Sequence, residues 1–261
     1  YQFSPIDYES GGALSFTNDA SLLLPTNAWG SNYVVVGYQA WDYSGDPFPG
    51  LMAVTATHDA TMVQITTTTP TEGGNGAPSF VPGVAQTVRL DRGDVLQLIA
   101  HTGDLTGSSV VADKPVEVLA GHHCTQLPHG SEACDHLEDQ MFPTEKLATK
   151  YLVAANALPS STEPRAFVVR VVATAPNTHV KFDPALPMGD VVLAKAGDMF
   201  EVPAAPIDRL VTSDQKIVVA QYMVSQLFPP AAESGDPAMA LAVPVAQYRR
   251  DYQFMAPLSY A

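Results

Sequence analysis

In this chain of 261 residues, a series of strand-like segments occurs twice in the same order and begins a third time near the end. The third start is Ala242-Val-Pro244, with Tyr252-Gln-Phe254 in the place of an aromatic strand. The matching pairs in the first two copies are Leu23–Pro25 and Gln140–Pro143, Asn32–Val35 and Lys150–Val153, the strand from Leu51 and Phe167–Ala173, Thr57–Ile65 and Ala175–Phe182, Gly93–Leu98 and Gly197–Val202, and Ala112–Val118 and Ser213–Ala220. The offsets are 118 residues from Pro25 to Pro143 and 101 residues from Pro143 to Pro244. Such a period fits a small β-sandwich and is too long for a solenoid repeat.

The repeated segments have the composition of β-strands. Asn32–Tyr38 is rich in β-branched and aromatic residues, and Thr61–Thr67 alternates apolar with polar residues. Leu51–Thr57 and Thr61–Thr67 are separated by a short turn, so we expect them to form a hairpin. A short helix is expected only around Cys134–Met141. The chain is therefore predicted to be all-β, made of tandem β-sandwich-like repeats with an elaborated connecting loop.

The repeat divides the chain into four parts. Residues 1–19 are a lead-in segment, 20–139 the first β-repeat with its elaborated loop, and 140–240 the second β-repeat. Residues 241–261 are either the start of a third repeat or a closing strand. Because the sequence opens at Tyr1 rather than Met, we expect a processed or excised piece.

Charge disfavours two classes of partner. Acidic residues outnumber basic ones 27 to 13, and the formal net charge of −14 repels phosphate backbones and anionic lipid surfaces. No apolar run approaches the roughly 18 residues that span a bilayer. We therefore expect neither nucleic acid binding nor membrane insertion. Few lysines and a strand-rich pattern favour a secreted or cell-surface protein.

The densest chemistry lies between Asp113 and Pro143. This segment holds both cysteines, four of the seven histidines and a group of carboxylates. These residues are Cys124, Cys134, His122, His123, His129, His136, Glu132, Asp135, Glu138 and Asp139. Two cysteines spaced ten apart are consistent with one local disulfide in an oxidising compartment or with two free thiols in a reducing one.

Metal and enzyme chemistry are alternatives for this segment. Two cysteines and two histidines can form a tetrahedral zinc set, but the spacing matches no standard finger. The carboxylates of Asp135, Glu138 or Asp139 are alternatively ligands for a calcium ion. No EF-type loop is present, however, and a solvated acidic face also explains these residues. Gly-x-Ser-x-Gly and His-Glu-x-x-His motifs are both missing from the sequence. A pair such as Asp135 and Glu138 in a glycoside hydrolase is the remaining catalytic hypothesis.

Two further motifs have simpler structural explanations. Pro70–Gly83 is glycine-rich, but no helix follows to present its N-terminus to a phosphate, so we interpret it as a loop. Arg92-Gly93-Asp94 matches an integrin-type tripeptide. In a turn after a strand, Gly93 is explained by its backbone conformation alone.

An ordered set of motifs resembles the N-terminal domain of the IgG Fc-binding protein family. The set is Asp104-Leu-Thr-Gly107, Asp113-Lys-Pro-Val116, Gly121-His-His-Cys124 and Cys134-Asp-His-Leu-Glu-Asp-Gln140, and Asn18–Pro25 and Gly235–Met239 resemble bacterial members. The resemblance implies an extracellular β-rich module of adhesive or mucus-type assemblies, without catalysis. It also implies that Cys124 and Cys134 form a disulfide that ties the connecting loop. The cysteine-rich domains of the large animal proteins are absent from this chain, so IgG binding is not transferred.

We therefore expect a non-catalytic, extracellular structural or adhesive module without cofactor or metal. Its partner is a protein or glycan at a cell surface or matrix, or further copies of the chain joined through strand pairing into a homo-oligomer or fibre. The candidate binding surface comprises His122, His123, Asp135, His136 and Glu138. The alternative is a carbohydrate-active hydrolase or a metal-binding protein with its site near His122 and Asp135.

Overall fold

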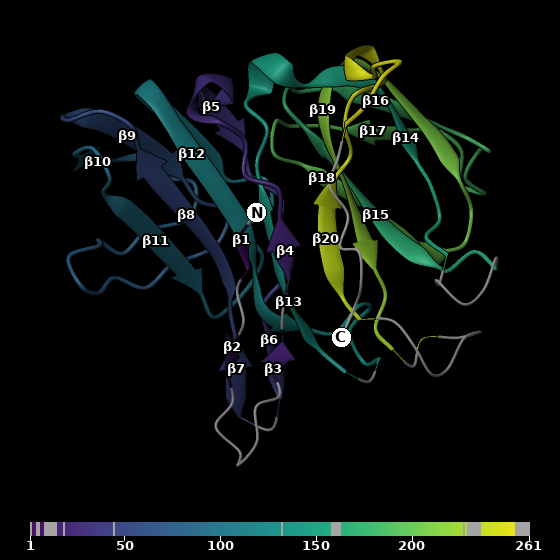
Figure 1. The fold of residues 1–261 in the computed structure, drawn as a ribbon, viewed down its shortest axis with the longest axis horizontal. Helices are drawn as coiled ribbons and strands as arrows, with labels where there is room; N and C mark the ends of the chain where they lie inside the picture. Colours follow the sequence, from purple (N-terminus) through teal and green to yellow (C-terminus); the bar gives the residue numbers. More distant parts are fainter. Residues whose placement is uncertain are drawn as a thin grey trace.

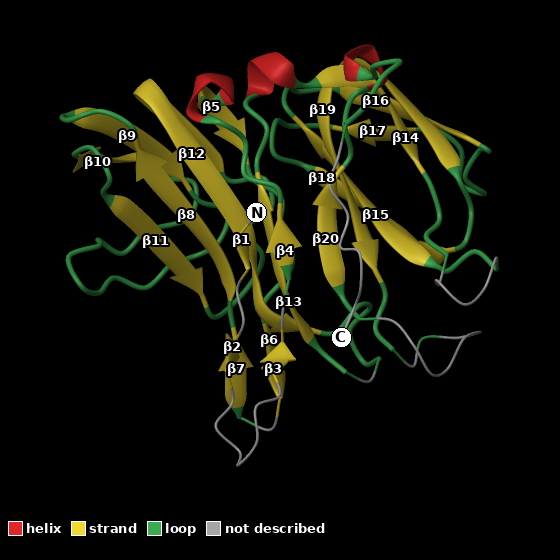
Figure 2. Ribbon diagram, viewed as in Figure 1, coloured by secondary structure: helices red, strands yellow, loops and turns green. Residues whose placement is uncertain are grey.

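The computed structural model describes residues 2–3, 6–7, 15–17, 19–43, 45–131, 133–157, 163–226, 228 and 236–253. As predicted, the fold is all-β, and the helices in the described ranges are three short 3₁₀ turns. Two curled sheets lie side by side, and the 3₁₀ turns stand in a row along one end (Figures 1 and 2). The turns are η1 Thr26–Ala28, η2 Thr144–Lys146 and η3 Val245–Gln247.

The first sheet is built around one long strand. Its order is β10-β9-β12-β8-β11, and β5 and β13 also pair with β12. The bounds are β5 Gly30–Val34, β8 Gly50–Ala56, β9 Thr61–Thr66, β10 Gln86–Leu90, β11 Val95–Ala100, β12 Ser109–Thr125 and β13 Asp135–Gln140.

β12 changes partners half way along. Ser109–Ala112 pairs with β9 and Ser109–Val111 with β5, which meets β12 once more at Val116. Val116–His122 pairs with β8, and β13 runs along the far part of the strand. The change falls around Pro115, which has no N–H to donate to the ladder. The sheet therefore curls into two layers, β10-β9-β12-β5 and β11-β8-β12-β13, which share β12.

These two layers enclose an apolar core. β8 and β9 bury every second side chain, as the period of two requires, and Met52, Val54, Val63 and Ile65 are fully buried. Burial of each such side chain contributes about 1.5–3 kcal/mol relative to leaving it exposed.

The second sheet has the same pairing order. Its strands run β17-β16-β19-β15-β18, and β14 and β20 also pair with the long strand β19. The bounds are β14 Ala148–Val153, β15 Phe167–Ala173, β16 Thr178–Asp183, β17 Val191–Leu193, β18 Met199–Ala205, β19 Arg209–Met223 and β20 Ala238–Leu241. The strand order thus corresponds position by position between the sheets, while the repeat bounds stay a prediction.

The two sheets pack against each other through β15. All seven of its residues are buried. Phe167, Val169 and Val171 face the core of the second sheet, whereas Val168 and Val172 join the core of the first. Because β15 is buried on both faces, its sequence is hydrophobic at every position except Arg170.

The expected hairpin of Leu51–Thr57 with Thr61–Thr67 is wrong. β12 lies between β8 and β9, so the two strands pair with it and not with each other. Their short connection crosses from one layer to the other. Alternation of side chains indicates a strand but does not identify its neighbour.

The expected helix around Cys134–Met141 is also wrong. Asp135–Gln140 is the strand β13, antiparallel to β12. Polar residues obscured the strand pattern, since two of its three acidic residues, Asp135 and Glu138, are buried in the fold.

Short strands complete the described fold. β1 Gln2–Phe3 pairs with β4 Ala20–Ser21, β2 Ile6–Asp7 with β3 Ser15–Thr17, and β6 Trp41–Tyr43 with β7 Asp46–Phe48. Within the described ranges, no helix has the length and apolar character to cross a membrane.

Candidate functional site

Cys124 and Cys134 form a disulfide. The sulfur atoms are 2.06 Å apart and the Cα atoms 5.2 Å apart. The bond closes the loop between β12 and β13, so the disulfide implied by the family resemblance is present. Oxidised cysteines supply neither a thiolate ligand for zinc nor a nucleophile.

His122 and His123 lie on opposite faces of β12. His122 is buried, its Nδ1 accepts a hydrogen bond from the Cys124 N–H at 3.2 Å, and burial lowers its pKa to about 3. His123 is half-buried and stacks on Phe48 with ring centroids 5.6 Å apart. Burial lowers the pKa of His123 as well, so both rings are neutral near pH 7.

His136 and Glu138 form a buried pair on β13. Nε2 of His136 is 3.7 Å from a Glu138 carboxylate oxygen, and its Nδ1 is 3.2 Å from the His123 carbonyl. Burial acts to lower the pKa of His136, but the hydrogen bonds to Glu138 and His123 outweigh it, and the pKa is raised. Asp135, also buried, accepts the N–H of His136 at 2.7 Å.

Asp139 ties three distant segments together. Its carboxylate accepts hydrogen bonds from the Ser21 hydroxyl at 2.8 Å and from the Leu241 N–H of β20 at 2.6 Å. Burial raises its pKa. The carboxylate therefore holds β13 against both the N-terminal segment and the second sheet.

Of the five residues predicted to form a binding surface, four are buried. His122, Asp135, His136 and Glu138 expose 0–6 % of their area, and His123 is the partly exposed member. A macromolecule docking on the outer surface does not reach the four buried side chains in this structure. A binding role for this set stays a prediction.

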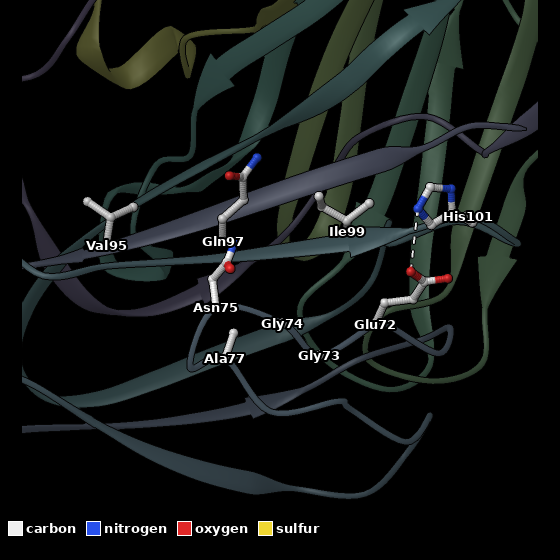
Figure 3. A pocket seen from close by; sticks show the side chains of 9 residues that line it. All are labelled: Glu72, Gly73, Gly74, Asn75, Ala77, Val95, Gln97, Ile99 and His101. Carbon is white, nitrogen blue, oxygen red and sulfur yellow. Dashed lines mark ion pairs between the residues drawn. The ribbon is translucent and has the colours of Figure 1, made fainter.

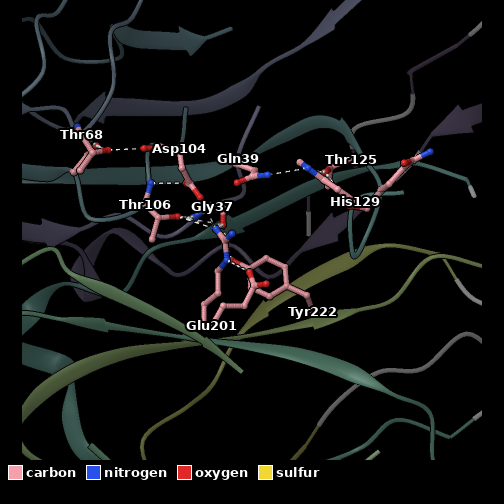
Figure 4. A network of polar contacts seen from close by, with 12 residues as sticks. Gly37, Gln39, Thr68, Asp104, Thr106, Thr125, His129, Glu201 and Tyr222 are labelled. Carbon is pink, nitrogen blue, oxygen red and sulfur yellow. Dashed lines mark hydrogen bonds and ion pairs between the residues drawn. The ribbon is translucent and has the colours of Figure 1, made fainter. Parts of the chain in front are cut away.

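A second polar cluster, which the sequence did not reveal, lies between the two sheets (Figure 4). Arg170 on β15 is 3 % exposed. Its Nε is 2.8 Å from a Glu201 oxygen, and its Nη1 is 2.8 Å from an Asp104 oxygen. Nη1 also donates to the Gly37 carbonyl at 2.7 Å. Asp104 and Gly37 lie in connections between strands of the first sheet, whereas Glu201 lies on β18 of the second. One arginine of the second sheet therefore binds polar groups from both parts of the chain.

Two tyrosines line the same cluster. The guanidinium of Arg170 lies over the Tyr38 ring, and the Tyr222 hydroxyl donates to the Gly37 carbonyl at 2.7 Å. Burial acts to lower the pKa of Arg170, but Tyr222, Asp104 and Glu201 raise it above its usual value. The only sequence signal is an arginine inside the otherwise apolar Phe167–Ala173.

His129 connects this cluster to the disulfide loop. Its Nδ1 is 2.9 Å from Gln39 Nε2, and its ring meets Tyr38 edge-on at 5.4 Å between centroids. The sequence placed His129 in the central segment but gave no link to Arg170. Tyr38 therefore lies between the disulfide loop and the Arg170 cluster.

A groove of about 330 Å³ lies beside β11 (Figure 3). The glycine-rich loop forms one wall and the outward side chains of β11 the other. The lining residues are Glu72, Gly73, Gly74, Asn75, Ala77, Val95, Gln97, Ile99 and His101. Nε2 of His101 is 3.7 Å from a Glu72 carboxylate oxygen.

Gly93 of the Arg-Gly-Asp turn has a φ of 86°, as expected for glycine in a turn.

The described residues hold no group of three or more His, Cys, Asp or Glu arranged to bind a metal ion. Histidine and carboxylate side chains of the central segment, such as His136, Glu138 and Asp139, form contacts within the chain.

Comparison with known proteins defines the class of this β-rich module. The family model described as IgGFc binding protein matches residues 19–261, so the chain belongs to the IgGFc-binding protein family. Among curated proteins, the human IgGFc-binding protein is 40 % identical over 87 residues. The match covers 33 % of this chain and 2 % of the human protein. No solved structure matches the chain.

Proposed function

We propose that the chain is a non-catalytic, extracellular module that binds a protein partner. The observation that carries the proposal is the family match over residues 19–261, because the family is named for binding and not for a reaction. The disulfide supports a secreted or cell-surface location. The motifs Asn18–Pro25 and Gly235–Met239 support a bacterial-type member.

The outer edge of β11 is the proposed contact surface. β11 pairs with β8 alone among the named strands, and the Glu72 N–H donates to the Ile99 carbonyl from the side away from β8. Backbone groups alternate in direction along a strand, so those of Val95 and Gln97 also point away from β8. An extended segment of the partner can pair with them and fill the groove.

The groove itself favours a peptide of mixed character. Val95 is 60 % exposed and offers an apolar contact, while Gln97, Asn75 and the Glu72–His101 pair offer polar ones. A segment that alternates apolar and polar side chains matches such a surface. This mode of recognition also accommodates a second copy of the chain.

Binding of the chain to two probes tests the proposal. The probes are the human IgG Fc fragment and a second copy of the chain, each measured against immobilised chain by biolayer interferometry. Gln97→Pro removes an outward N–H without touching the ladder to β8 and should abolish binding, whereas Gln97→Ala should retain it. Failure of both probes to bind would contradict the proposal, and binding to a glycan array alone would reassign the partner.

A further inference from the structure

The described part of the chain contains three copies of one turn, each made of a proline, a 3₁₀ helix and a tyrosine. They are Pro25–Tyr33 around η1, Pro143–Tyr151 around η2 and Pro244–Tyr252 around η3. The prolines have φ values of −65°, −62° and −57° and ψ values of 150°, 147° and 138°. The three turns therefore share one backbone conformation.

The tyrosine hydroxyl takes part in each turn in the same way. It accepts the N–H of the residue three positions earlier. The distances are 2.8 Å from Gly30 to Tyr33, 2.9 Å from Ala148 to Tyr151, and 2.8 Å from Arg249 to Tyr252. This bond fixes the phenol before any other partner is present.

In the first two copies the hydroxyl also donates to a long strand. Tyr33 donates to the Val116 carbonyl of β12 and Tyr151 to the Ile217 carbonyl of β19, each at 2.7 Å. Both rings are buried, at 2 % and 0 % exposure, and burial raises the pKa of each tyrosine to about 12. Each of these two turns thus binds the long strand of its own sheet through the tyrosine hydroxyl.

In the third copy the turn is present, but no long strand of the described residues contacts its tyrosine. Tyr252 is 63 % exposed, and within the described ranges its hydroxyl has no acceptor. A hollow of about 780 Å³ lies beside it. The lining residues are Val243, Ala246, Gln247, Tyr248, Arg249 and Tyr252.

The third turn nevertheless packs on the preceding part of the chain in the same way as the second turn does. η2 packs on the start of β5, where a Cβ atom at Gly30 would overlap Pro143 and Glu145. η3 packs on β14, since Pro244 forms a β-bridge with Tyr151 and Gln247 donates to the Lys146 carbonyl at 2.6 Å. The row of turns in Figure 2 therefore continues one arrangement.

We infer that Pro244–Tyr252 is a docking surface for the long strand of a further β-unit of the kind formed by residues 148–241. Its main-chain carbonyl would accept the Tyr252 hydroxyl. The long strands of a second copy of the described fold do not fit, because Tyr33 and Tyr151 already occupy the corresponding carbonyls. The inference does not depend on what the module binds elsewhere.

The test inserts a second copy of residues 152–252 directly after Tyr252 in the full chain. Tyr252 then stands before the added unit as Tyr151 stands before the second sheet. Nitration by tetranitromethane, located by peptide mass spectrometry, should fall at Tyr252 to the level of Tyr33 and Tyr151. The copy of Tyr252 at the new end should stay reactive and serves as an internal control.

Phenylalanine variants give a second measurement. Tyr252→Phe should leave thermal unfolding of the native chain unchanged and should lower the melting temperature of the added unit. Tyr151→Phe should lower the melting temperature of the native chain in the same way, because it removes the bond to the Ile217 carbonyl. The inference is overturned if the added unit folds while Tyr252 stays reactive or while Tyr252→Phe has no effect on it. It is also overturned if the added residues stay unfolded while the first 252 keep their transition.

Discussion

The guanidinium carbon of Arg170 lies 4.0 Å from the centroid of the Tyr38 ring, which joins the second sheet to the first. A desolvated cation over an aromatic face contributes about 2 kcal/mol. The same guanidinium pairs with Asp104 and Glu201, so its charge is balanced within the contact. The sheets are therefore held by a specific polar contact as well as by apolar packing.

Arg170→Met should destabilise the chain by about 3 kcal/mol, because it leaves Asp104 and Glu201 without their buried cation. Lys181→Met is the matched control, since Lys181 forms an exposed pair with Asp190 at 3.5 Å and should cost less than about 0.5 kcal/mol. Urea unfolding at neutral pH measures both. Equal losses in the two variants would contradict a special role for Arg170.

His122 should make the fold sensitive to acid. Its pKa falls from 6.5 in the unfolded chain to about 3 in the fold, so its contribution is complete above pH 6.5 and is lost as the pH falls toward 3. Between pH 7 and pH 5 this loss is about 2 kcal/mol. His122→Gln should remove that part of the pH dependence, whereas the exposed His179→Gln should retain it. Urea unfolding at the two pH values provides the comparison.

Loss of the disulfide should cost about 3 kcal/mol without abolishing the fold, because the bond closes a loop of only about ten residues. Cys124→Ala with Cys134→Ala should show a lower melting temperature and an unchanged far-ultraviolet circular dichroism spectrum. Alkylation of the native chain should add mass only after reduction. A native chain that alkylates without reductant would contradict the bond.

Gly121→Ala should be strongly destabilising, by about 3 kcal/mol or more. A Cβ atom at Gly121 would overlap the Leu137 carbonyl, so β13 could not stay paired with β12. Gly74→Ala is the control, because a Cβ atom there meets nothing within 4 Å. Denaturant unfolding separates the two outcomes, and similar stability of both variants would contradict this packing.

Individual strands were predictable because their side chains alternate or are β-branched, as in Thr61–Thr66 and Phe167–Ala173. Their neighbours were not, since the pairing of β8 and β9 with β12 depends on a strand more than forty residues further along the chain. β13 was missed because its carboxylates find partners such as Ser21 and Leu241 only in the fold. The motifs that led to the family also indicated the disulfide, whereas nothing near Arg170 in sequence indicated Tyr38 or Asp104.

Sharing β12 between two layers also affects the order in which the first sheet can form. β5, β8 and β9 all precede β12 in the chain, and each pairs with it. During synthesis from the N-terminus these strands therefore wait, with open edges, until residues 109–125 have emerged, and β19 imposes the same delay on the second sheet. Each sheet can therefore join its two layers only once its long strand is present, and β13 and β20, which follow the long strands, are added last.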